Sequence, residues 1–267
     1  MSQFATLFLF LQPKATKPAM NTNLPVHQEG NKFRQELCVP CYQTDRQGLL
    51  KPSGFMDMAQ EIAYWAAEAL GFGYDSLLIH HTAWVMARLH IQFLQPVRWR
   101  DSVTLFTWHK GSSGLLFLRD FLMCDATGAT SIAATSSWVV IDERSRRMVK
   151  PEDLLKLVQV EQVEHAISEP APKIALPKEM ELAGEHTVLS TEIDINGHTN
   201  NACYVVWAIS NLPSEEALRP VKDLYINFIK ETTEGECVQL YRHFSDNIWH
   251  VEGRLGGKSC FSVKLCY

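Results

Sequence analysis

"LHIQFLQPVRWRDSVTL" (residues 89–105) and "LYINFIKETTEGECVQL" (residues 224–240) are two versions of one segment, offset by 135 positions. Leucine, isoleucine, phenylalanine, an acidic residue, valine and leucine recur in the same order in both. A second match, between TDRQG (44–48) and IDING (193–197), has an offset of 149 positions. The second copy is therefore 14 residues shorter (149 − 135) between these two landmarks. Internal similarity of this kind predicts a duplicated module.

Each copy also predicts the same kinds of element. Apolar residues recur every three or four positions over residues 54–70 and Gly71 follows them, which predicts a helix with a wide apolar face. Alternating apolar residues predict strands over 84–93, 102–110, 114–128 and 130–142. The second copy predicts a helix over 201–210 and strands over 186–194, 222–230, 237–244, 247–255 and 260–267. We therefore expect an α+β fold in which each copy lays one helix on an antiparallel sheet.

These elements divide the chain into four parts. Residues 1–30 are expected to be a disordered lead, and residues 31–164 the first module. Residues 165–187 contain prolines among charged residues and are expected to be a linker, so that residues 188–267 form the second module. The apolar run at 4–11 is too short for a membrane span, which needs ~20 residues, and it lacks the basic start and cleavage site of a signal peptide.

The composition narrows the class of protein. The chain has 267 residues, of which 46% are hydrophobic, and its net charge of −5 does not indicate a nucleic-acid partner. Its seven cysteines are an odd number scattered through apolar runs, which favours reduced thiols in a cytoplasmic protein. Cys38 and Cys41 lack a second pair at zinc spacing, so we interpret them as structural residues rather than as metal or redox ligands.

The most polar stretch of the second copy is "DINGHTNN" (194–201), which stands directly before the predicted helix. Local structure alone could explain much of it. Asn196-Gly197 is a strong turn dipeptide, and Asn200 or Asn201 is a natural N-cap for the helix. Asp194 could cap the turn, and His198 could be an exposed loop residue.

The duplication argues for a further role. At the matching turn of the first copy, Gln47 stands in the place of Asn196 and Leu49 in the place of His198. The later match puts Pro96 opposite Glu231. Both copies predict the same turn but only one carries Asn, His and Glu, so the turn does not require them. Catalysis is the better interpretation.

Together, "DINGHTNN" and the "IKET" some thirty residues later resemble the acyl-acyl-carrier-protein thioesterases. Members of this family carry two fused hot-dog modules, each a curled antiparallel sheet wrapped around a central helix. An Asp-x-Asn-x-His-x-Asn-Asn stretch opens the second helix, and a glutamate follows on a strand. The resemblance covers about residues 33–267 and implies hydrolysis of fatty acyl-acyl carrier protein in fatty acid biosynthesis. It implies a catalytic set of Asp194, Asn196, His198 and Glu231.

The chemistry of thioester hydrolysis fits this set. Glu231 is expected to be the general base that deprotonates water, while Asn196 and His198 position the water and polarise the carbonyl. Asp194 would orient them, and N–H groups near Ala202 at the helix start would help hold the oxyanion. A thiolate is a good leaving group, so neither a metal nor another cofactor is expected. Hydrolysis of acyl-CoA by the same residues and a non-catalytic acyl-binding protein remain alternatives.

Two cysteine positions bear on the mechanism. Many plant members of the family have a cysteine directly after the glutamate, where this chain has Thr232, which disfavours a covalent acyl-cysteine. Cys203 lies close to the polar stretch, but on the apolar helix we expect it to pack in the core.

The acyl chain would need a dry tunnel, which we expect the first copy to supply. The candidate lining residues lie on its predicted helix, although the same residues could simply be core: Phe55, Met58, Ile62, Trp65, Ala66 and Ala69.

An acidic acyl carrier protein would need local cations for docking. A basic stretch after the last strand of the first copy supplies candidates, namely Arg144, Arg146, Arg147 and Lys150, and Arg98 and Arg100 lie on a predicted turn. A solvated hairpin is an equally good interpretation. No membrane or nucleic-acid partner is expected, and a homodimer remains open.

Overall fold

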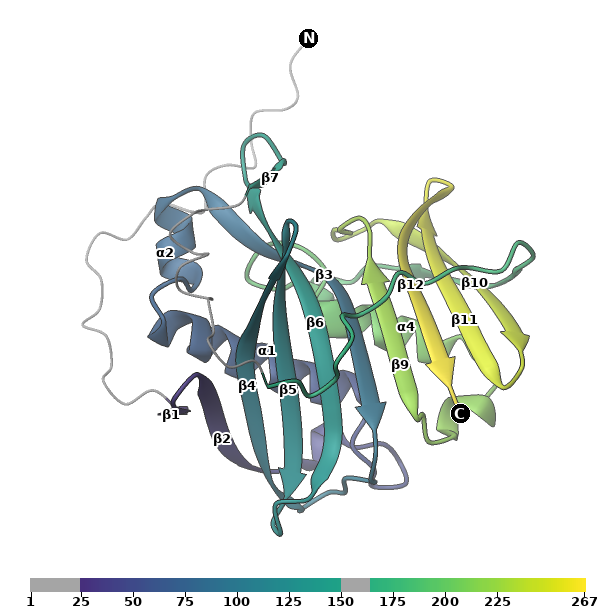
Figure 1. Ribbon diagram of the computed structural model, residues 1–267. Coiled ribbons are helices and arrows are strands. Elements are labelled where there is room, and N and C mark those ends of the chain that lie inside the picture. The colour runs from purple at the N-terminus through teal and green to yellow at the C-terminus, as the bar shows by residue number, and fades with distance from the viewer. Residues whose placement is uncertain (1–24, 150–163) are drawn as a thin grey trace.

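The computed structural model describes residues 25–149 and 164–267, which form one curled antiparallel sheet with helices on its inner side (Figure 1). The strands of the first half are β1 (His27–Glu29), β2 (Lys32–Cys38), β3 (Thr82–Phe93), β4 (Ser102–Ser113), β5 (Leu116–Asp125), β6 (Thr130–Asp142) and β7 (Met148–Val149). Those of the second half are β8 (Glu181–Thr187), β9 (Asp223–Phe228), β10 (Cys237–Ser245), β11 (Ile248–Leu255) and β12 (Lys258–Cys266).

Within residues 25–149 and 164–267, six helical segments accompany the strands. The α-helices are α1 (Pro52–Ala69), α2 (Tyr74–Ile79) and α4 (Asn201–Ser210). The 3₁₀-helices are η1 (Cys41–Gln43), η2 (Ser190–Glu192) and η3 (Glu216–Leu218). None of these described helices is long and apolar enough to cross a membrane.

The duplication is confirmed strand by strand. The order β2-β4-β5-β6-β3 in the first half recurs as β8-β10-β11-β12-β9 in the second. The two offsets also recur in single hydrogen bonds: Leu50 N donates to the Val97 carbonyl at 2.8 Å, and Thr199 N donates to the Thr232 carbonyl at 2.9 Å. The first residues of these two bonds differ by 149 positions and the second residues by 135. The expected α+β modules are therefore present, one in each half.

The two halves join through their equivalent strands. β3 pairs antiparallel with β9, so that Leu89 faces Ile226 and Ile91 faces Leu224. His90 and Tyr225 face each other at the centre, and their rings stack with centroids 4.0 Å apart. The pairing is symmetric about His90 and Tyr225, which are equivalent residues 135 positions apart: Leu89 meets the equivalent of Ile91, and Ile91 meets the equivalent of Leu89. This is the self-complementary pattern of a two-fold interface. One sheet runs through both modules.

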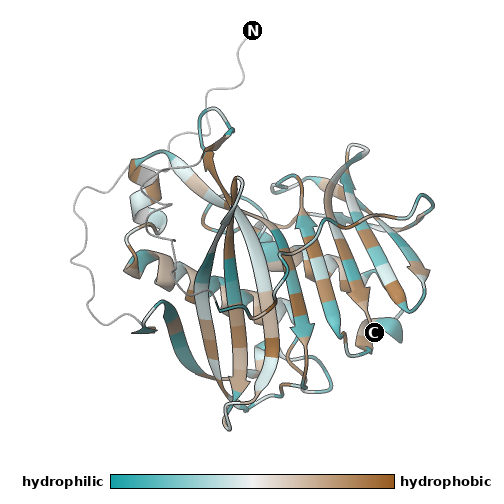
Figure 2. Cartoon of the chain, in the orientation of Figure 1, coloured by the Kyte–Doolittle hydropathy of each residue, from teal (hydrophilic) through white to brown (hydrophobic). Residues whose placement is uncertain are grey.

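The core lies between this sheet and the two central helices. Apolar and polar residues alternate along several strands, as the banding in Figure 2 shows, and many of the apolar ones are buried. Phe55 and Ile62 of α1 are fully buried, and Val205 and Ala208 of α4 are buried in the same continuous cluster. Full burial of a side chain such as Phe55 stabilises the fold by about 1.5–3 kcal/mol. The shared core ties α1 and α4 to one sheet.

The structure corrects the expected boundaries at two places. β1 takes up residues 27–29 of the expected disordered lead, while residues 1–24 lie outside the described part of the chain. β8 lies at 181–187, inside the expected linker, and the predicted strand over 186–194 is wrong. There the Glu192 carboxylate accepts hydrogen bonds from His186 Nε2 and Leu189 N, both at 2.8 Å, and closes a 3₁₀ turn instead of a ladder. The second module therefore begins with β8.

The segment that links the halves crosses the outer face of the first sheet (Figure 1). Trp108 Nε1 donates to the Glu164 carbonyl at 2.8 Å, and Lys110 Nζ donates to the Ile167 carbonyl at 2.7 Å. Further along, Asn227 Nδ2 of β9 donates to the Pro172 carbonyl at 3.0 Å. The linker is thus hydrogen-bonded to both halves.

Candidate active site

The polar stretch before α4 folds into a tight turn. Asp194 N donates to the His198 carbonyl at 2.8 Å, and Gly197 N donates to the Asp194 carbonyl at 3.0 Å. Gly197 has a φ of +79°, a conformation that glycine adopts at little cost. The Asp194 carboxylate accepts from Asn196 N at 2.8 Å and from His198 N at 3.4 Å, in the manner of an Asx turn.

The first half contains the same turn. Asp45 N donates to the Leu49 carbonyl at 2.8 Å, and the Asp45 carboxylate accepts from Gln47 N at 2.8 Å and from Leu49 N at 3.0 Å. Gly48 has a φ of +76°. The turn therefore needs its aspartate and its glycine, whereas a glutamine and a leucine serve at the positions of Asn196 and His198. Nothing in the turn accounts for the amide and the imidazole.

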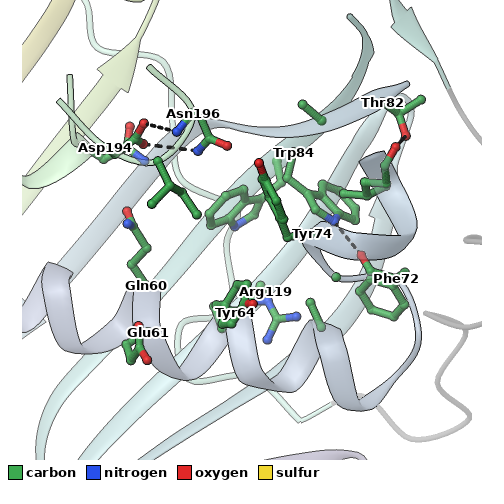
Figure 3. Close-up of a pocket in the computed structure, with 18 of the residues that line it drawn as sticks. Gln60, Glu61, Tyr64, Phe72, Tyr74, Thr82, Trp84, Arg119, Asp194 and Asn196 are labelled. Carbon is green, nitrogen blue, oxygen red and sulfur yellow. Dashed lines mark hydrogen bonds between the residues drawn. The ribbon is translucent and has the colours of Figure 1, made fainter. Parts of the chain in front are cut away.

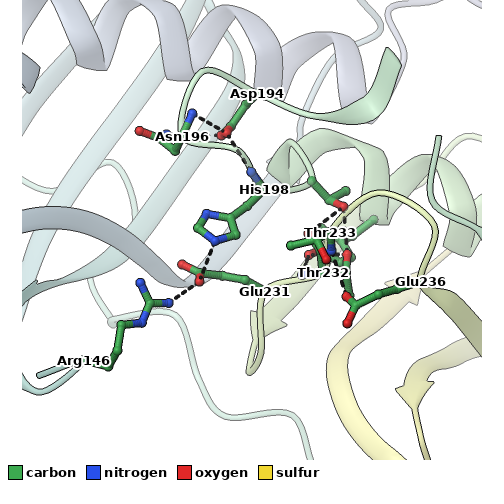
Figure 4. A network of polar contacts seen from close by, with 10 residues as sticks. Arg146, Asp194, Asn196, His198, Glu231, Thr232, Thr233 and Glu236 are labelled. Carbon is green, nitrogen blue, oxygen red and sulfur yellow. Dashed lines mark hydrogen bonds and ion pairs between the residues drawn. The ribbon is translucent and has the colours of Figure 1, made fainter. Parts of the chain in front are cut away.

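The imidazole contacts the distant glutamate. His198 Nε2 lies 3.3 Å from Glu231 Oε2, and their side chains are 32% and 29% exposed (Figure 4). Asn196 Nδ2 donates to Asp194 Oδ2 at 3.3 Å. The structure thus brings His198 and Glu231 into contact and places Asn196 and Asp194 on the same turn. Asp194 contacts Asn196 and His198 through their backbone N–H groups and through the Asn196 side-chain amide.

The residue after Glu231 anchors the segment that carries it. Thr232 is fully buried, and its Oγ1 lies 2.7 Å from Thr199 Oγ1 and 3.0 Å from the Tyr204 hydroxyl. Thr232 N also donates to that hydroxyl at 3.1 Å. Burial raises the pKa of Tyr204. These bonds tie the Glu231 segment to the turn and to α4, so position 232 has a structural role here.

Asn200 is the N-cap of α4. Its Oδ1 accepts from Ala202 N at 2.9 Å, which selects it over Asn201 as the capping residue. The Ala202 N–H is therefore engaged by the cap, and oxyanion donors among the N–H groups near Ala202 stay a prediction. Cys203 is half-buried and packs against the core, and burial raises the pKa of its thiol to about 11. Its expected packing role fits this position.

A cavity of about 510 Å³ opens between α1, the first half of the sheet and the turn of residues 194–198, the candidate catalytic turn (Figure 3). This volume is within the range of small-molecule sites. At one end the cavity is lined by Asp194 and Asn196, whereas His198 and Glu231 are not among its lining residues. Its walls are mainly aromatic and small apolar side chains, including Tyr64, Ala67, Phe72, Trp84 and Trp138. It can hold an acyl chain that reaches the turn.

The six predicted tunnel residues do not line this cavity. Phe55, Ile62 and Ala66 are fully buried in the core, Met58 and Trp65 pack against it, and Ala69 is exposed. Instead α1 borders the cavity with Gln60, Glu61, Ala63, Tyr64 and Ala67. Helical periodicity identifies the most apolar face, and that face packs on the sheet. The cavity lies along the side of α1 next to that face, so the apolar periodicity of the sequence does not identify its lining residues.

The basic stretch reaches the site from the other half. Arg146, in the turn between β6 and β7, forms an ion pair with Glu231 Oε2 (Figure 4). Arg144 Nη2 lies 3.1 Å from His81 Nε2, Arg147 is exposed, and Lys150 lies outside the described residues. A docking face and a solvated hairpin both remain interpretations of these cations, and the contact with Glu231 was not predicted.

The second group of candidate cations is also exposed. Arg98 and Arg100 both lie on the surface, and the Arg100 guanidinium stacks 4.2 Å from the centroid of the Trp99 ring.

Known proteins resemble this chain in sequence. Oleoyl-acyl carrier protein thioesterase 2, chloroplastic, from Arabidopsis thaliana is 25% identical over 234 residues, which are 79% of this chain and 62% of that protein. Palmitoyl-acyl carrier protein thioesterase, chloroplastic, from the same plant is 26% identical over 199 residues, 70% of this chain and 48% of that protein. The chain thus spans less than two thirds of either relative's length.

Solved structures resemble it in fold. The 12:0-ACP thioesterase from Umbellularia californica has a TM-score of 0.78 and 21% identity, with 90% of this chain and 98% of that chain covered. An acyl-ACP thioesterase from Bacteroides thetaiotaomicron has a TM-score of 0.75 and 21% identity, with 88% and 97% covered. These likenesses confirm the expected double hot-dog arrangement.

Two family models match the two halves in order. The acyl-ACP thioesterase N-terminal domain matches residues 30–157, and the acyl-ACP thioesterase C-terminal domain matches residues 177–256. Together they cover more than half of the chain, which therefore belongs to the acyl-ACP thioesterase family.

Proposed function

We propose that this protein hydrolyses the thioester of fatty acyl-acyl carrier protein and releases free fatty acid and holo-carrier protein in fatty acid biosynthesis. The observation that carries the proposal is the contact of His198 with Glu231, made from the same turn whose Asn196 lines one end of the cavity. The first half makes the same turn without these side chains, so they serve something other than folding. The names of the two Arabidopsis relatives point to the same substrate class.

Glu231 is the proposed general base. Its side chain is partly exposed, so water can reach it, and His198 Nε2 at 3.3 Å holds the carboxylate in place. A water molecule between Glu231 and the thioester loses its proton to the carboxylate as its oxygen attacks the carbonyl carbon. General-base assistance of this kind contributes typically about 10²–10⁴-fold to a rate.

Asn196 is the proposed partner of the thioester carbonyl. It lines the cavity at the catalytic turn, and one of its amide hydrogens is directed to Asp194, which leaves the other for the developing oxyanion. When the tetrahedral intermediate collapses, the carbon–sulfur bond breaks and the sulfur leaves as a thiolate. The proton held by Glu231 then passes to that sulfur, so that acid and thiol are the products.

Two alternatives use the same fold. Hydrolysis of acyl-CoA would need the same catalytic residues, and an acyl-binding protein would need the cavity alone. Exposed cations lie beside the site, because Arg146 contacts Glu231 and Arg147 follows it on the exposed turn, and they complement both the acidic surface of a carrier protein and the phosphates of CoA. An acidic carrier docked on this turn would bring its thioester to the catalytic residues.

The experiment is a comparison of carriers. The purified protein is incubated with acyl-acyl carrier proteins of several chain lengths and with acyl-CoA of the same lengths, and released acid is measured. We expect acid release from the carrier-protein series with the higher kcat/KM. Higher kcat/KM on CoA would favour the acyl-CoA alternative, and acyl binding without release from either carrier would favour the non-catalytic one.

The cytoplasmic location and the homodimer stay predictions. Fractionation of the producing cell tests the first, which matters because both named plant relatives are chloroplastic. Light scattering of the purified chain tests the second.

A further inference from the structure

Arg119 of β5 lies inside the molecule and lines the cavity far along the chain from the catalytic turn (Figure 3). Arg119 is only 3% exposed. Nη1 donates to Thr107 Oγ1 at 3.1 Å, and Nη2 forms a short hydrogen bond with His109 Nε2. Both partners are uncharged, because burial and the neighbouring Arg119 charge lower the pKa of His109 well below its ordinary value.

No carboxylate balances this guanidinium within residues 25–149 and 164–267, where Arg119 forms no ion pair. Burial lowers its pKa to about 9, and no acidic group opposes that effect. Arg119 is therefore still a cation at neutral pH. Glu61 and Glu143 also line the cavity, but neither pairs with Arg119, and the Glu61 carboxylate accepts a hydrogen bond from Trp65 Nε1 at 2.6 Å.

The positions next to His109 and Arg119 on the same two strands hold another buried cation, and this one is paired with an acid. Lys110 of β4 and Asp120 of β5 are one residue further along each strand, with side chains 1% and 0% exposed. They pair with each other at 3.0 Å, and Asp120 also accepts from Ala166 N at 2.7 Å. The fold thus neutralises the cation on the outer face of the sheet and leaves the one in the cavity without an anion. A buried charge without a partner ordinarily costs several kcal/mol.

The lining of the cavity is mixed: aromatic and small apolar walls carry several polar residues, of which Asn196 and Arg119 bear on the substrate. Asn196 lines it where the thioester would lie, Trp84 and Trp138 form part of the walls, and Arg119 lines it elsewhere. A guanidinium has five N–H donors, of which the contacts to Thr107 and His109 use two. The remaining donors can serve a ligand oxygen. An all-hydrocarbon chain would leave them unused.

We propose that Arg119 is a binding residue for an oxygen function, a hydroxyl or a carboxylate, at the far end of the acyl chain. The preferred substrates are then ω-oxygenated acyl thioesters rather than plain alkyl ones. This inference rests on the proposed thioesterase function and specifies its substrate class. Charge-assisted hydrogen bonds are among the stronger polar contacts. A carboxylate matches Arg119 better than a hydroxyl does, because the planar guanidinium can donate two parallel hydrogen bonds to its two oxygens.

The first test needs no variant. Acyl-carrier-protein substrates of matched chain length ending in methyl, hydroxyl or carboxylate compete for the wild-type protein. We expect kcat/KM for at least one oxygenated chain to exceed that for the methyl chain by about tenfold or more, the discrimination expected from one charge-assisted hydrogen bond. Equal or higher kcat/KM for the methyl chain at every length would overturn the inference while leaving the thioesterase function intact.

The second test assigns the preference to Arg119. Arg119→Met keeps the length of the side chain without its charge, and we expect the ratio of oxygenated to methyl kcat/KM to fall by about tenfold. Arg254→Met is the control, because Arg254 pairs with Glu252 in the second half and does not line the cavity. A folded Arg119→Met protein with the wild-type ratio would contradict the assignment. Thermal melts show whether each variant is folded. If Arg119→Met does not fold, the competition between substrates on the wild-type protein decides the inference.

A binding measurement separates this inference from the proposed reaction. Non-hydrolysable acyl-pantetheine amides with the same three chain ends are titrated into wild-type protein by calorimetry. Tighter binding of the hydroxyl or carboxylate form supports the Arg119 site even if no thioester is hydrolysed. Equal affinities for all three overturn it whether or not the protein is a thioesterase.

Discussion

Arg146 of the first half forms an ion pair with Glu231 of the second, across the junction of the two modules. On its other side the same carboxylate oxygen lies 3.3 Å from His198 Nε2. The proposed general base is therefore held between a cation of the non-catalytic half and an imidazole of its own half. The duplicated modules contribute differently to one site, and the basic turn that we expect to meet the carrier protein is part of it.

The exposed cation next to Arg146 tests carrier docking. Arg147→Glu should lower kcat/KM for acyl-acyl carrier protein about tenfold or more at low salt, because a reversed charge slows association with an acidic partner. The loss should shrink at high salt. Hydrolysis of acyl-pantetheine, which lacks the carrier protein, should change little. Arg34→Glu on β2, which pairs with Glu29 and Glu36 across the sheet from this turn, is the control. Equal losses on both substrates would argue against docking at this turn.

The two equivalent aspartates separate turn stability from catalysis. Asp45→Ala and Asp194→Ala remove the same carboxylate bonds from the two copies of one turn, so each should cost about 1–3 kcal/mol of unfolding free energy. Only Asp194→Ala should also lower kcat, because only its turn carries Asn196 and His198. Denaturant melts and acid release measure the two effects. A similar loss of kcat in the folded Asp45→Ala protein would count against a division of labour between the halves.

Two alanines of α1 test the cavity assignment. Ala63 lines the cavity, whereas Ala66 is fully buried in the core. Ala63→Leu should shift the preference toward shorter acyl chains, since each methylene that no longer fits loses about 0.8 kcal/mol of burial, or fourfold in specificity. Ala66→Leu should instead cost about 1–3 kcal/mol of stability through overpacking, with the chain-length profile unchanged. The reverse pattern in the chain-length assay would move the acyl site to the core face of α1.

Residues close together in sequence were the ones whose structure could be predicted. The helix at 201–210 and the turn at Asp194 and Gly197 follow from local spacing and capping, and both are confirmed. The duplication showed which turn residues were free for chemistry, and His198 indeed contacts Glu231. These inferences needed either neighbours along the chain or a second copy for comparison.

Contacts between distant segments could not be predicted in the same way. The β3–β9 junction depends on strand pairing across more than a hundred residues, which alternation of apolar residues does not specify. The cavity lies on the flank of α1 because that helix packs its most apolar face on the sheet. In the sequence, Arg119 lies within a predicted strand and nothing in the pattern around it indicates a binding role. Only the fold shows that it is buried, that it lines the cavity and that it forms no ion pair with the described residues.

The thiol nearest the site should be unreactive. Burial raises the pKa of Cys203 to about 11, so its thiolate fraction at neutral pH is small and increases as the pH rises toward that value. Cys203→Ser should keep most of the activity, and alkylation of Cys203 by iodoacetamide should still accelerate above pH 9. Peptide mass spectrometry measures the alkylation and also detects any acyl adduct. An acylated Cys203 trapped during turnover would replace the general-base mechanism with a covalent one.

The most direct test of the central claim is the rate of acid release by Glu231→Gln in a single turnover, with acyl-acyl carrier protein as substrate. The glutamine keeps the size of the side chain but cannot accept the proton of water, so the rate should fall by about 10²–10⁴-fold. Glu234→Gln, three residues further on an exposed part of the same loop, removes the same charge and should keep the wild-type rate. A folded Glu231→Gln protein that releases acid within about threefold of the wild-type rate would contradict the account, because Glu231 could not then be the base.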